Sequence, residues 1–228
     1  MAMAGCFGAR NLVAIRAGRI ESDGSRICPN VDGGAAMTGG INSVSAALRI
    51  DAGQTDVQRD GDGNVCNTRT SDDVVTGVDL TAEICIFDWE LIETLTGGII
   101  AVNAGTTHGW EVKSATESAP HTQFDAWART WDGAGQATSA HAYTRFTAYN
   151  TTWVPGTITM NEGALTLPLT GKGSENSNIS IGLWDDIPTE FVGTFYGLWT
   201  TSSSDLPDSP NPDGNDCGYI DVPACSSS

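Results

Sequence analysis

A change of hydrophobic period within residues 76–98, TGVDLTAEICIFDWELIETLTGG, constrains the fold more than any other feature of the chain. The segment opens with strict alternation of polar and apolar residues, which is typical of a half-buried β-strand. One face of the expected strand is polar, with a cysteine at its end. The other face carries five apolar side chains: Val78, Leu80, Ala82, Ile84 and Ile86. We therefore expect a strand that packs one side on a core.

The same segment then takes up helical spacing. Asp88 has the side chain of a good N-cap, and Glu90 follows it where the helix dipole favours negative charge. An apolar stripe (Leu91, Ile92 and Leu95) opposes a polar one (Glu90, Glu93 and Thr94), and Gly97 and Gly98 end the pattern. We predict one short α-helix over about residues 89–96. Because about two turns of helix are unstable alone in water, this helix must lie against a sheet.

The composition extends this prediction to the whole chain. A chain of 228 residues with 27 glycines and many Ser, Thr and Asp clusters suits short strands joined by turns. No segment supplies further long amphipathic helices. We therefore expect an all-β (β-rich) fold, a β-sandwich or barrel flanked by one short α-helix.

Further strands follow from alternation and turn residues. Residues 9–28 suggest a strand pair that turns at Asp23 and Gly24, and residues 29–40 suggest a glycine-rich loop. The strand expected over residues 141–153 would place Tyr143, Arg145, Thr147, Tyr149 and Trp153 on one face. Pro168 favours an edge position for its strand. The other strands are expected at residues 41–52, 98–102, 124–131, 157–160, 164–170 and 179–183. In a last strand, Phe191, Phe195 and Trp199 are expected to line one face.

The polar segment of residues 54–75 is too polar for a core and too long for a simple connection. Its centre, Asp60-Gly61-Asp62-Gly63-Asn64, resembles a calcium loop. An EF-hand loop that starts at Asp60 requires glycine at its sixth position and a carboxylate at its twelfth, but Val65 and Ser71 stand there. We therefore expect a plain Asp-Gly turn.

The formal charge of −17 and the sequence pI near 4.2 argue against a nucleic-acid binder, because such proteins carry a basic surface patch. Anionic membranes should repel the chain too, and no segment is apolar enough to span a bilayer. The amino-terminal residues lack the pattern of a secretory signal. Solubility alone explains such a charge in most acidic proteins. The sharper alternative is a surface that stays near DNA without binding it.

Chemistry-bearing motifs are missing from the sequence. We find no nucleophile elbow, dinucleotide fingerprint or zincin helix, and residues 171–174 place glycine after Lys172 where a phosphate loop needs Ser or Thr. The three histidines (His108, His121 and His141) have no spacing suited to one metal site. Cys217 and Cys225 could close a small loop in an oxidising medium. We expect no catalytic residues, no metal site and no cofactor.

The order of motifs resembles the major tail proteins (tail tube proteins) of long-tailed, non-contractile bacteriophages, particularly those that infect actinobacteria. The resemblance rests on IRAGRIESDG, DGDGNVC, LTAEICIFDWELIETLTGG and PLTGKGSENSNISIGLWDDIP, which together span roughly residues 9–190. It implies a tail-tube β-domain over residues 1–200. The acidic Ser/Pro/Asp-rich carboxyl-terminal arm of residues 201–228 lies outside the pattern.

The resemblance also implies a function. It predicts stacked, hexameric rings that form a conduit for the viral genome. Under that interpretation we expect residues 54–75 to form a long polar hairpin that makes the contact between rings, and the acidic balance of the chain to give an acidic-lined conduit for DNA. Expected partners are other copies of the chain, the tape measure, tail terminator and distal tail proteins, and genome DNA that passes without specific binding. Such a protein would assemble in the host cytoplasm and reside in the virion. The alternatives are a carbohydrate-binding or adhesive β-sandwich, suggested by seven tryptophans, and a glycan hydrolase, which would need two facing carboxylates.

Overall fold

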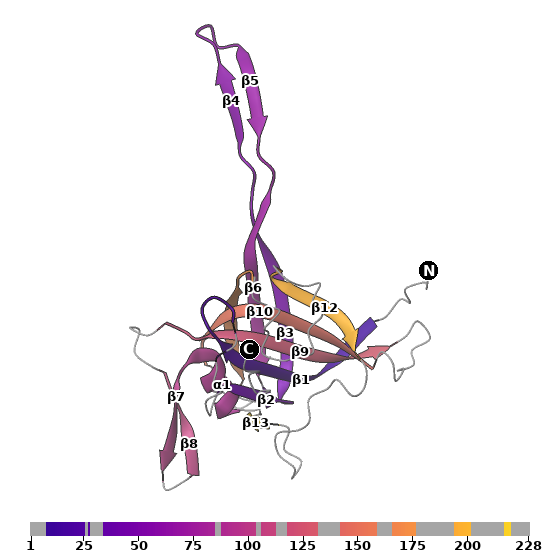
Figure 1. Cartoon of the computed structure of the whole chain (residues 1–228), viewed down its shortest axis with the longest axis vertical. Coiled ribbons are helices and arrows are strands. Elements are labelled where there is room, and N and C mark those ends of the chain that lie inside the picture. The colour runs from indigo at the N-terminus through magenta and orange to yellow at the C-terminus, as the bar shows by residue number, and fades with distance from the viewer. Residues whose placement is uncertain are drawn as a thin grey trace, which may run out of the picture.

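The computed structural model describes residues 8–25, 27, 34–84, 88–103, 106–112, 118–131, 142–158, 166–176, 194–201 and 217–219. The described chain is mostly β-structure with one short helix, as the sequence predicts (Figure 1). In chain order the elements are β1 (Gly8–Ile20), β2 (Ala35–Thr38), β3 (Ile41–Asp51), β4 (Thr55–Arg59), β5 (Val65–Thr70), β6 (Val74–Ile84), α1 (Trp89–Thr96), β7 (Ile99–Asn103), β8 (Thr106–Glu111), β9 (His121–Trp131), β10 (Tyr143–Pro155), β11 (Leu167–Gly173), β12 (Tyr196–Thr201) and β13 (Cys217–Tyr219).

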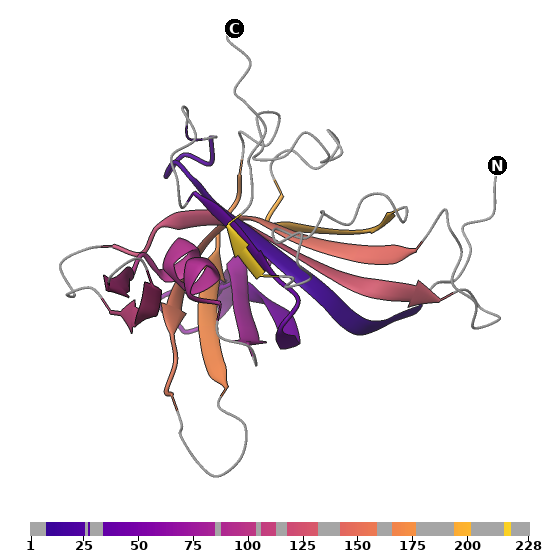
Figure 2. The same cartoon turned by 90° about the horizontal axis from the view of Figure 1, so that it is seen from below.

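The main sheet is antiparallel and divides at β10. Its strand order is β13-β2-β1-β9-β10-β11-β6-β3, and β12 also pairs with β10. One edge of β10 pairs with β9, whereas the other pairs with β12 along its first half and with β11 along its second half. The sheet therefore separates into two facing layers, β13-β2-β1-β9-β10-β12 and β11-β6-β3, in a sandwich-like arrangement (Figure 2).

The apolar face of β6 lies in the core between these layers, as its alternation predicts. Val78, Leu80, Ala82 and Ile84 are all buried, whereas Asp79 on the opposite face is exposed. The buried side chains of β6 meet those of β1, β9, β10 and β11 in one cluster. Burying each large aliphatic side chain contributes about 1.5–3 kcal/mol, which makes this strand a main source of stability.

Helix α1 has the boundaries and caps expected from the sequence. The carboxylate of Asp88 accepts a hydrogen bond from Leu91 N at 3.0 Å, and Gly97 adopts the left-handed conformation with φ of 72°. The carbonyl of Glu93 accepts from Gly97 N and also from the guanidinium of Arg19 on β1, the latter at 2.8 Å, so β1 is joined to the helix end. The predicted polar stripe is wrong at Thr94, which is completely buried. A threonine fits there because the helix packs more than its apolar stripe against the sheet.

The expected strand pair of residues 9–28 is corrected by the structure. Strand β1 does end at a turn, in which Gly24 N donates to the carbonyl of Glu21 at 2.9 Å. The strand that pairs back onto β1 is β2, which lies inside the stretch predicted to be a glycine-rich loop. β2 has only four residues, AAMT, so its sequence is too short and its side chains too small to show a strand pattern beside the surrounding glycines.

The face assignment of β10 holds for Arg145 and Thr147 but is wrong for Trp153. A register irregularity between Ala148 and Thr151 shifts the alternation of the strand. The Trp153 ring consequently lies in the main core, 4.8 Å from the ring of Phe124. An inserted residue reverses the face of every later side chain, and the sequence gives no sign of it.

Strand β11 is an interior strand, contrary to the edge position expected from Pro168. It lies between β10 and β6, but its pairing with β10 ends at Leu169. Pro168 is therefore tolerated next to the end of that ladder, where its missing N–H leaves no partner unpaired.

The two glycines that flank Lys172 have a packing role. A Cβ on Gly171 would lie 2.8 Å from the Trp153 ring, so glycine makes room for the indole.

Several other expectations have mixed outcomes. Thr157 and Ile158 lie in a connection, not in the predicted strand, and residues 179–183 lie outside the described residues, as do His141 and Cys225. The predicted common face of the last strand is wrong, because Phe195 packs on the main core whereas Trp199 stacks on Arg145. Strand β13 pairs with β2, so part of the carboxyl-terminal arm continues the main sheet.

Candidate assembly surfaces

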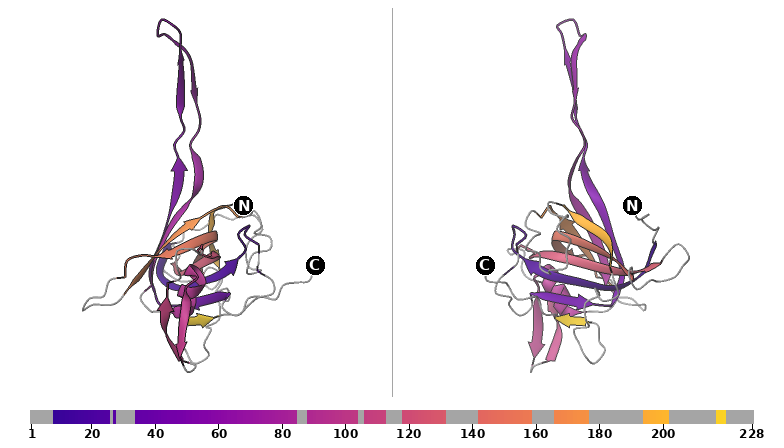
Figure 3. Two further views of the ribbon diagram at one scale, coloured as in Figure 1. Left: turned by 90° about the vertical axis from the view of Figure 1, so that its left-hand side faces the viewer. Right: turned by 45° about the vertical axis from the view of Figure 1, so that its right-hand side comes forward.

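Residues 54–75 form a long hairpin that leaves the body of the protein as an arm (Figures 1 and 3). Within it β4 pairs with β5, and every residue of both strands is exposed. Five aspartates and two arginines give the arm a surplus of negative charge. The sequence prediction of a long polar hairpin is therefore confirmed, and its role as a contact between rings stays a prediction.

The root of the arm is fixed by close contact between its two strands. Ser71 N donates to the carbonyl of Gln54 at 3.0 Å, and Gly53 N donates to the carboxylate of Asp73 at 2.8 Å. A Cβ on Gly53 would lie 1.8 Å from the Ser71 carbonyl oxygen. Only glycine allows the two strands to cross at this point, so Gly53 helps to set the direction of the arm.

The tip of the arm is the Asp-Gly turn that the sequence predicts. The Asp60 carboxylate accepts hydrogen bonds from the backbone N–H groups of Asp62 and Asn64 at 3.0 and 2.7 Å. The side-chain amide of Asn64 donates to the second carboxylate oxygen at 3.1 Å, and these bonds lower the pKa of Asp60. The carboxylate that resembles a calcium ligand is thus engaged by its own loop.

A second hairpin, β7–β8, leaves the body at the end opposite the arm (Figure 3). It exposes apolar side chains: Ile99 is 51% and Val102 61% exposed. A two-stranded hairpin with exposed apolar residues is marginal on its own in water, which makes this hairpin a second candidate contact surface.

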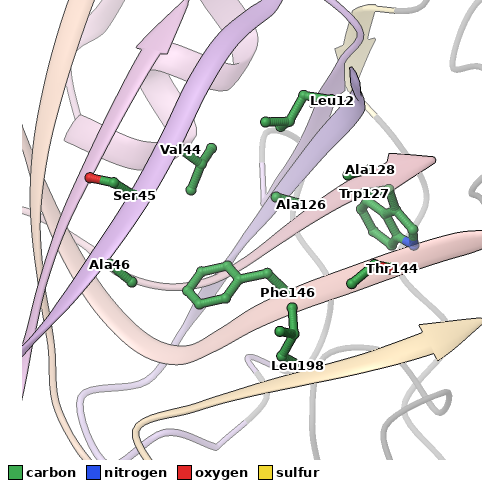
Figure 4. Close-up of a pocket in the computed structure, with 10 residues that line it drawn as sticks. All are labelled: Leu12, Val44, Ser45, Ala46, Ala126, Trp127, Ala128, Thr144, Phe146 and Leu198. Atoms are coloured by element: carbon green, nitrogen blue, oxygen red, sulfur yellow. The ribbon is translucent and has the colours of Figure 1, made fainter. Parts of the chain in front are cut away.

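An apolar trough opens where the two layers of the sandwich separate. Its volume is about 230 Å³, and β3 forms one wall while β1, β9, β10 and β12 form the other (Figure 4). Leu198 on β12 is 64% exposed and Ala46 on β3 is exposed, so the trough is open to solvent. The residues that line it are Leu12, Val44, Ser45, Ala46, Ala126, Trp127, Ala128, Thr144, Phe146 and Leu198.

The outer face of β3 and β6 is polar and rich in hydroxyl groups. Ser45 and Thr81 share a hydrogen bond across the strands at 2.6 Å. Arg49 and Asp79 form an ion pair beside them, and the hydrogen bond from Arg49 lowers the pKa of Asp79. An exposed pair of this kind adds little stability, so this face is suited to contact with water or with a polar surface.

A cluster of charges lies buried on the other face of the β1-β9-β10 layer. Asp125 is completely buried between two arginines, with Arg16 Nη2 at 2.9 Å and Arg145 Nη2 at 3.0 Å, and Thr147 donates to the same carboxylate. Burial alone would raise the pKa of Asp125, but the charges of the two arginines and the Thr147 hydrogen bond outweigh it and lower the pKa.

Aromatic rings complete this cluster. The Trp127 ring lies between the guanidinium groups of Arg16 and Arg145, at 4.9 and 5.1 Å from the ring centroid, and Trp199 lies on the far side of Arg145 at 5.0 Å. Alternating cations and rings thus connect four adjacent strands, β1, β9, β10 and β12. Because the carboxylate is fully buried and paired, the cluster stabilises the layer and offers no acid or base to a substrate.

His121 is the histidine whose side chain lies in the described part of the structure. His121 Nδ1 lies 2.7 Å from the side-chain oxygen of Asn150, a hydrogen bond within the layer. Among the described residues, no group of three or more His, Cys, Asp or Glu side chains is arranged to hold a metal ion. Trp127 and Trp153 are fully buried, and the other four described tryptophans are half-buried.

No protein-family model matches the chain, and a search of curated proteins finds no match. Within the described residues, no helix has the length and apolarity that crossing a membrane requires.

Proposed function

We propose that this protein is a structural subunit of a bacteriophage tail tube, which self-assembles into stacked rings. The arm of residues 54–75 carries the proposal. A hairpin of two strands is marginally stable at best in water, yet this one is exposed on both faces and extends far from the body (Figure 1). A partner surface along the arm explains why a chain retains such an element. In an assembly of identical subunits, that partner is another copy.

The positions of the two hairpins favour stacking. The arm and the β7–β8 hairpin leave opposite ends of the protein (Figure 3). A contact between the arm of one copy and the opposite end of the next copy can therefore repeat along one axis. Repeated head-to-tail contacts of this kind build a filament, and contacts around a rotation axis close a ring. The family resemblance implies six subunits in each ring.

Strand edges provide the sideways contacts that a ring needs. In the described part of the chain, β3 pairs only with β6, and β12 pairs only with β10. The opposite edge of β3 therefore carries backbone N–H and C=O groups that no described strand pairs with. Such edges invite pairing with another chain, and a ring of subunits satisfies them without leaving an open end.

The charge of the chain fits passage of DNA. A formal charge of −17 repels phosphates, and screening extends over about 8 Å at physiological salt. A negatively charged wall close to a duplex thus lets the genome slide without binding it. In this role the protein needs no catalytic group and no cofactor. Its partners are its own copies and the tape measure, tail terminator and distal tail proteins, in a virion assembled in the host cytoplasm.

The carbohydrate-binding alternative has less support. Sugar platforms need an open aromatic ring, and the six described tryptophans are buried or half-buried. The trough of about 230 Å³ is also smaller than the roughly 300–1,000 Å³ that is usual for small-molecule sites, and it is lined mainly by aliphatic residues.

Negative-stain electron microscopy of the purified protein at high concentration tests the proposal. We expect rings or tubes with a central channel. A protein that stays monomeric at every concentration, and that binds a glycan array, would reject the tail-tube role in favour of the alternative. A filter-binding series with duplex DNA adds a second test: no complex is expected at physiological ionic strength, and a micromolar complex would contradict the conduit.

A further inference from the structure

The apolar face of β3 continues from the trough to the root of the arm. Ala46 lines the trough, and Leu48 and Ile50 alternate with it along the strand (Figure 4). On β6, Val78 beside Leu48 is buried, whereas Val75 beside Ile50 is 38% exposed. Leu48 and Ile50 are themselves 46% and 54% exposed. These three exposed aliphatic side chains, Leu48, Ile50 and Val75, form an arm-root patch, in which an apolar surface that is buried lower in the sheet becomes open to solvent.

The β7–β8 hairpin carries a second apolar surface at the other end of the protein (Figure 3). Ile100 and Val102 alternate on one face of β7, and Ile100 pairs across the hairpin with Trp110. Val102 is exposed, as is Val112 directly after β8. The hairpin therefore has an apolar face of which the outer part, around Val102, has no cover from its own chain.

The base of this hairpin is fixed to the body. Trp110 is half-buried and packs against the main core. A Cβ on Gly98 would lie 1.7 Å from Trp110 Nε1, so glycine at the end of α1 lets the indole lie against the backbone. An exposed apolar surface on an anchored element adds nothing to the core of its own chain. Such a surface is typical of a contact with another protein.

Charge favours the hairpin as the part of a second copy that covers the arm-root patch. Residues 49–51 and 72–75, which flank the patch, contain three aspartates and one arginine, in a chain of net charge −17. Residues 98–112 contain one carboxylate, Glu111, and no lysine or arginine. That carboxylate is on the face of the hairpin opposite Val102. Because two strongly negative copies repel each other where charged surfaces meet, a nearly neutral apolar hairpin can approach the patch with little repulsion.

We propose that the β7–β8 hairpin of one copy packs its apolar face on the arm-root patch of the next copy, an inference that rests on the proposed self-assembly. The two surfaces lie at opposite ends of the molecule, so each copy uses its hairpin at one end and its patch at the other (Figure 3). A contact between two different surfaces propagates from copy to copy. The arm leaves the body beside the patch, so the arm and the patch contact the same neighbouring copy.

A pair of charge substitutions tests whether the two surfaces meet. Ile50→Lys and Val102→Glu each place a charge in the contact, and both side chains are more than half exposed, so the fold tolerates the changes. We expect each substitution alone to raise the protein concentration needed for tubes about tenfold. In a chain with both, the introduced lysine of one copy faces the introduced glutamate of the next, and we expect most of the loss to be recovered.

The matched control for the rescue is Val154→Lys, at an exposed valine of β10 outside both surfaces. It supplies the same positive charge to the chain, but it should leave the loss caused by Val102→Glu unchanged. Thermal unfolding followed by circular dichroism confirms that each variant is folded. Equal rescue by Ile50→Lys and Val154→Lys, or rescue by neither, overturns the inference.

Photo-crosslinking detects the contact without adding a charge. Val102 is replaced by a benzophenone-bearing phenylalanine analogue, and this protein is assembled with isotopically labelled wild-type chains. We expect mass spectrometry to find cross-links to labelled peptides that contain the arm-root patch. Cross-links to residues 98–112 of labelled chains would show instead that hairpins pack on one another, and cross-links confined to the unlabelled chain itself would show no contact between copies. Either result overturns the inference.

The assembly test separates this inference from the proposed function. If the wild-type protein forms tubes and position 102 cross-links elsewhere, only the inference fails. If the wild-type protein forms neither rings nor tubes, the proposed function fails and the inference fails with it.

Discussion

Arg16 and Asp125 form a buried ion pair at 2.9 Å although 109 positions separate them in the chain. Arg145 approaches the other carboxylate oxygen at 3.0 Å. The three residues come from β1, β9 and β10, the adjacent central strands of one layer. A pair that is this far apart in sequence and this well buried fixes the register of the layer, because a shift of one residue would leave a charge without its partner.

Removal of the shared carboxylate is expected to destabilise the protein strongly. Asp125→Asn preserves the shape of the side chain but removes the buried negative charge that Arg16 and Arg145 share. Breaking a buried pair in this way costs about 3–5 kcal/mol. Thermal and urea unfolding of the variant, followed by circular dichroism, measure the loss.

The matched control is Asp79→Asn, which removes the carboxylate of the exposed pair with Arg49. Asp79 and Arg49 both contact solvent, so water replaces the lost interaction and we expect an unchanged unfolding midpoint. Equal effects of the two substitutions would show that burial does not determine the contribution of the Asp125 cluster.

Acid should remove the contribution of Asp125. Its folded-state pKa lies below the ordinary value of 3.8, so the folded state binds the proton less readily than the unfolded state. The stabilisation is therefore complete above the unfolded pKa and is lost as the pH falls through the folded pKa. We expect the difference in unfolding free energy between wild type and Asp125→Asn to be constant above about pH 5 and to shrink below pH 4. A difference that grows on acidification would contradict the assigned charge state.

The sequence predicts the elements whose pattern is local. Strand β6 and helix α1 follow from a change of period, one N-cap and a terminal glycine, all within 23 adjacent residues. The arm also follows, because its polarity excludes a core position. In each case the residues that determine the structure are neighbours in the chain.

Features that depend on distant contacts could not be predicted. The cluster of Arg16, Asp125 and Arg145 looks like three ordinary charges in alternating strands, and only the pairing of β1 with β9 and β10 brings them together. The trough could not be predicted either, because it also depends on which strands pair. Val44 and Leu48 indicate a buried face by their alternation, but β3 lies at a sheet edge where no described element covers them. Periodicity identifies an apolar face without identifying what packs on it.

The end of α1 gives a prediction for backbone conformation. Gly97 has φ of 72°, and a Cβ there would lie 2.9 Å from Pro120 Cδ. A left-handed conformation costs about 1–2 kcal/mol for residues other than glycine, so Gly97→Ala should lower the unfolding free energy by that amount. Gly97→Asn should cost less, because asparagine tolerates this conformation while it presents the same Cβ to Pro120. Equal losses in urea titrations would assign the effect to the Pro120 contact alone.

The root of the arm allows assembly to be separated from folding. Gly53→Ala places a Cβ against the Ser71 carbonyl oxygen, which forces the two strands of the arm apart where they cross. The arm contributes no buried side chain to the core, so we expect an unchanged unfolding midpoint of the body together with loss of tubes in electron micrographs. Gly61→Ala, at the arm tip with nothing within 4 Å of the new Cβ, is the control and should assemble normally. Tubes of normal length from Gly53→Ala would show that contacts between rings do not depend on the direction of the arm.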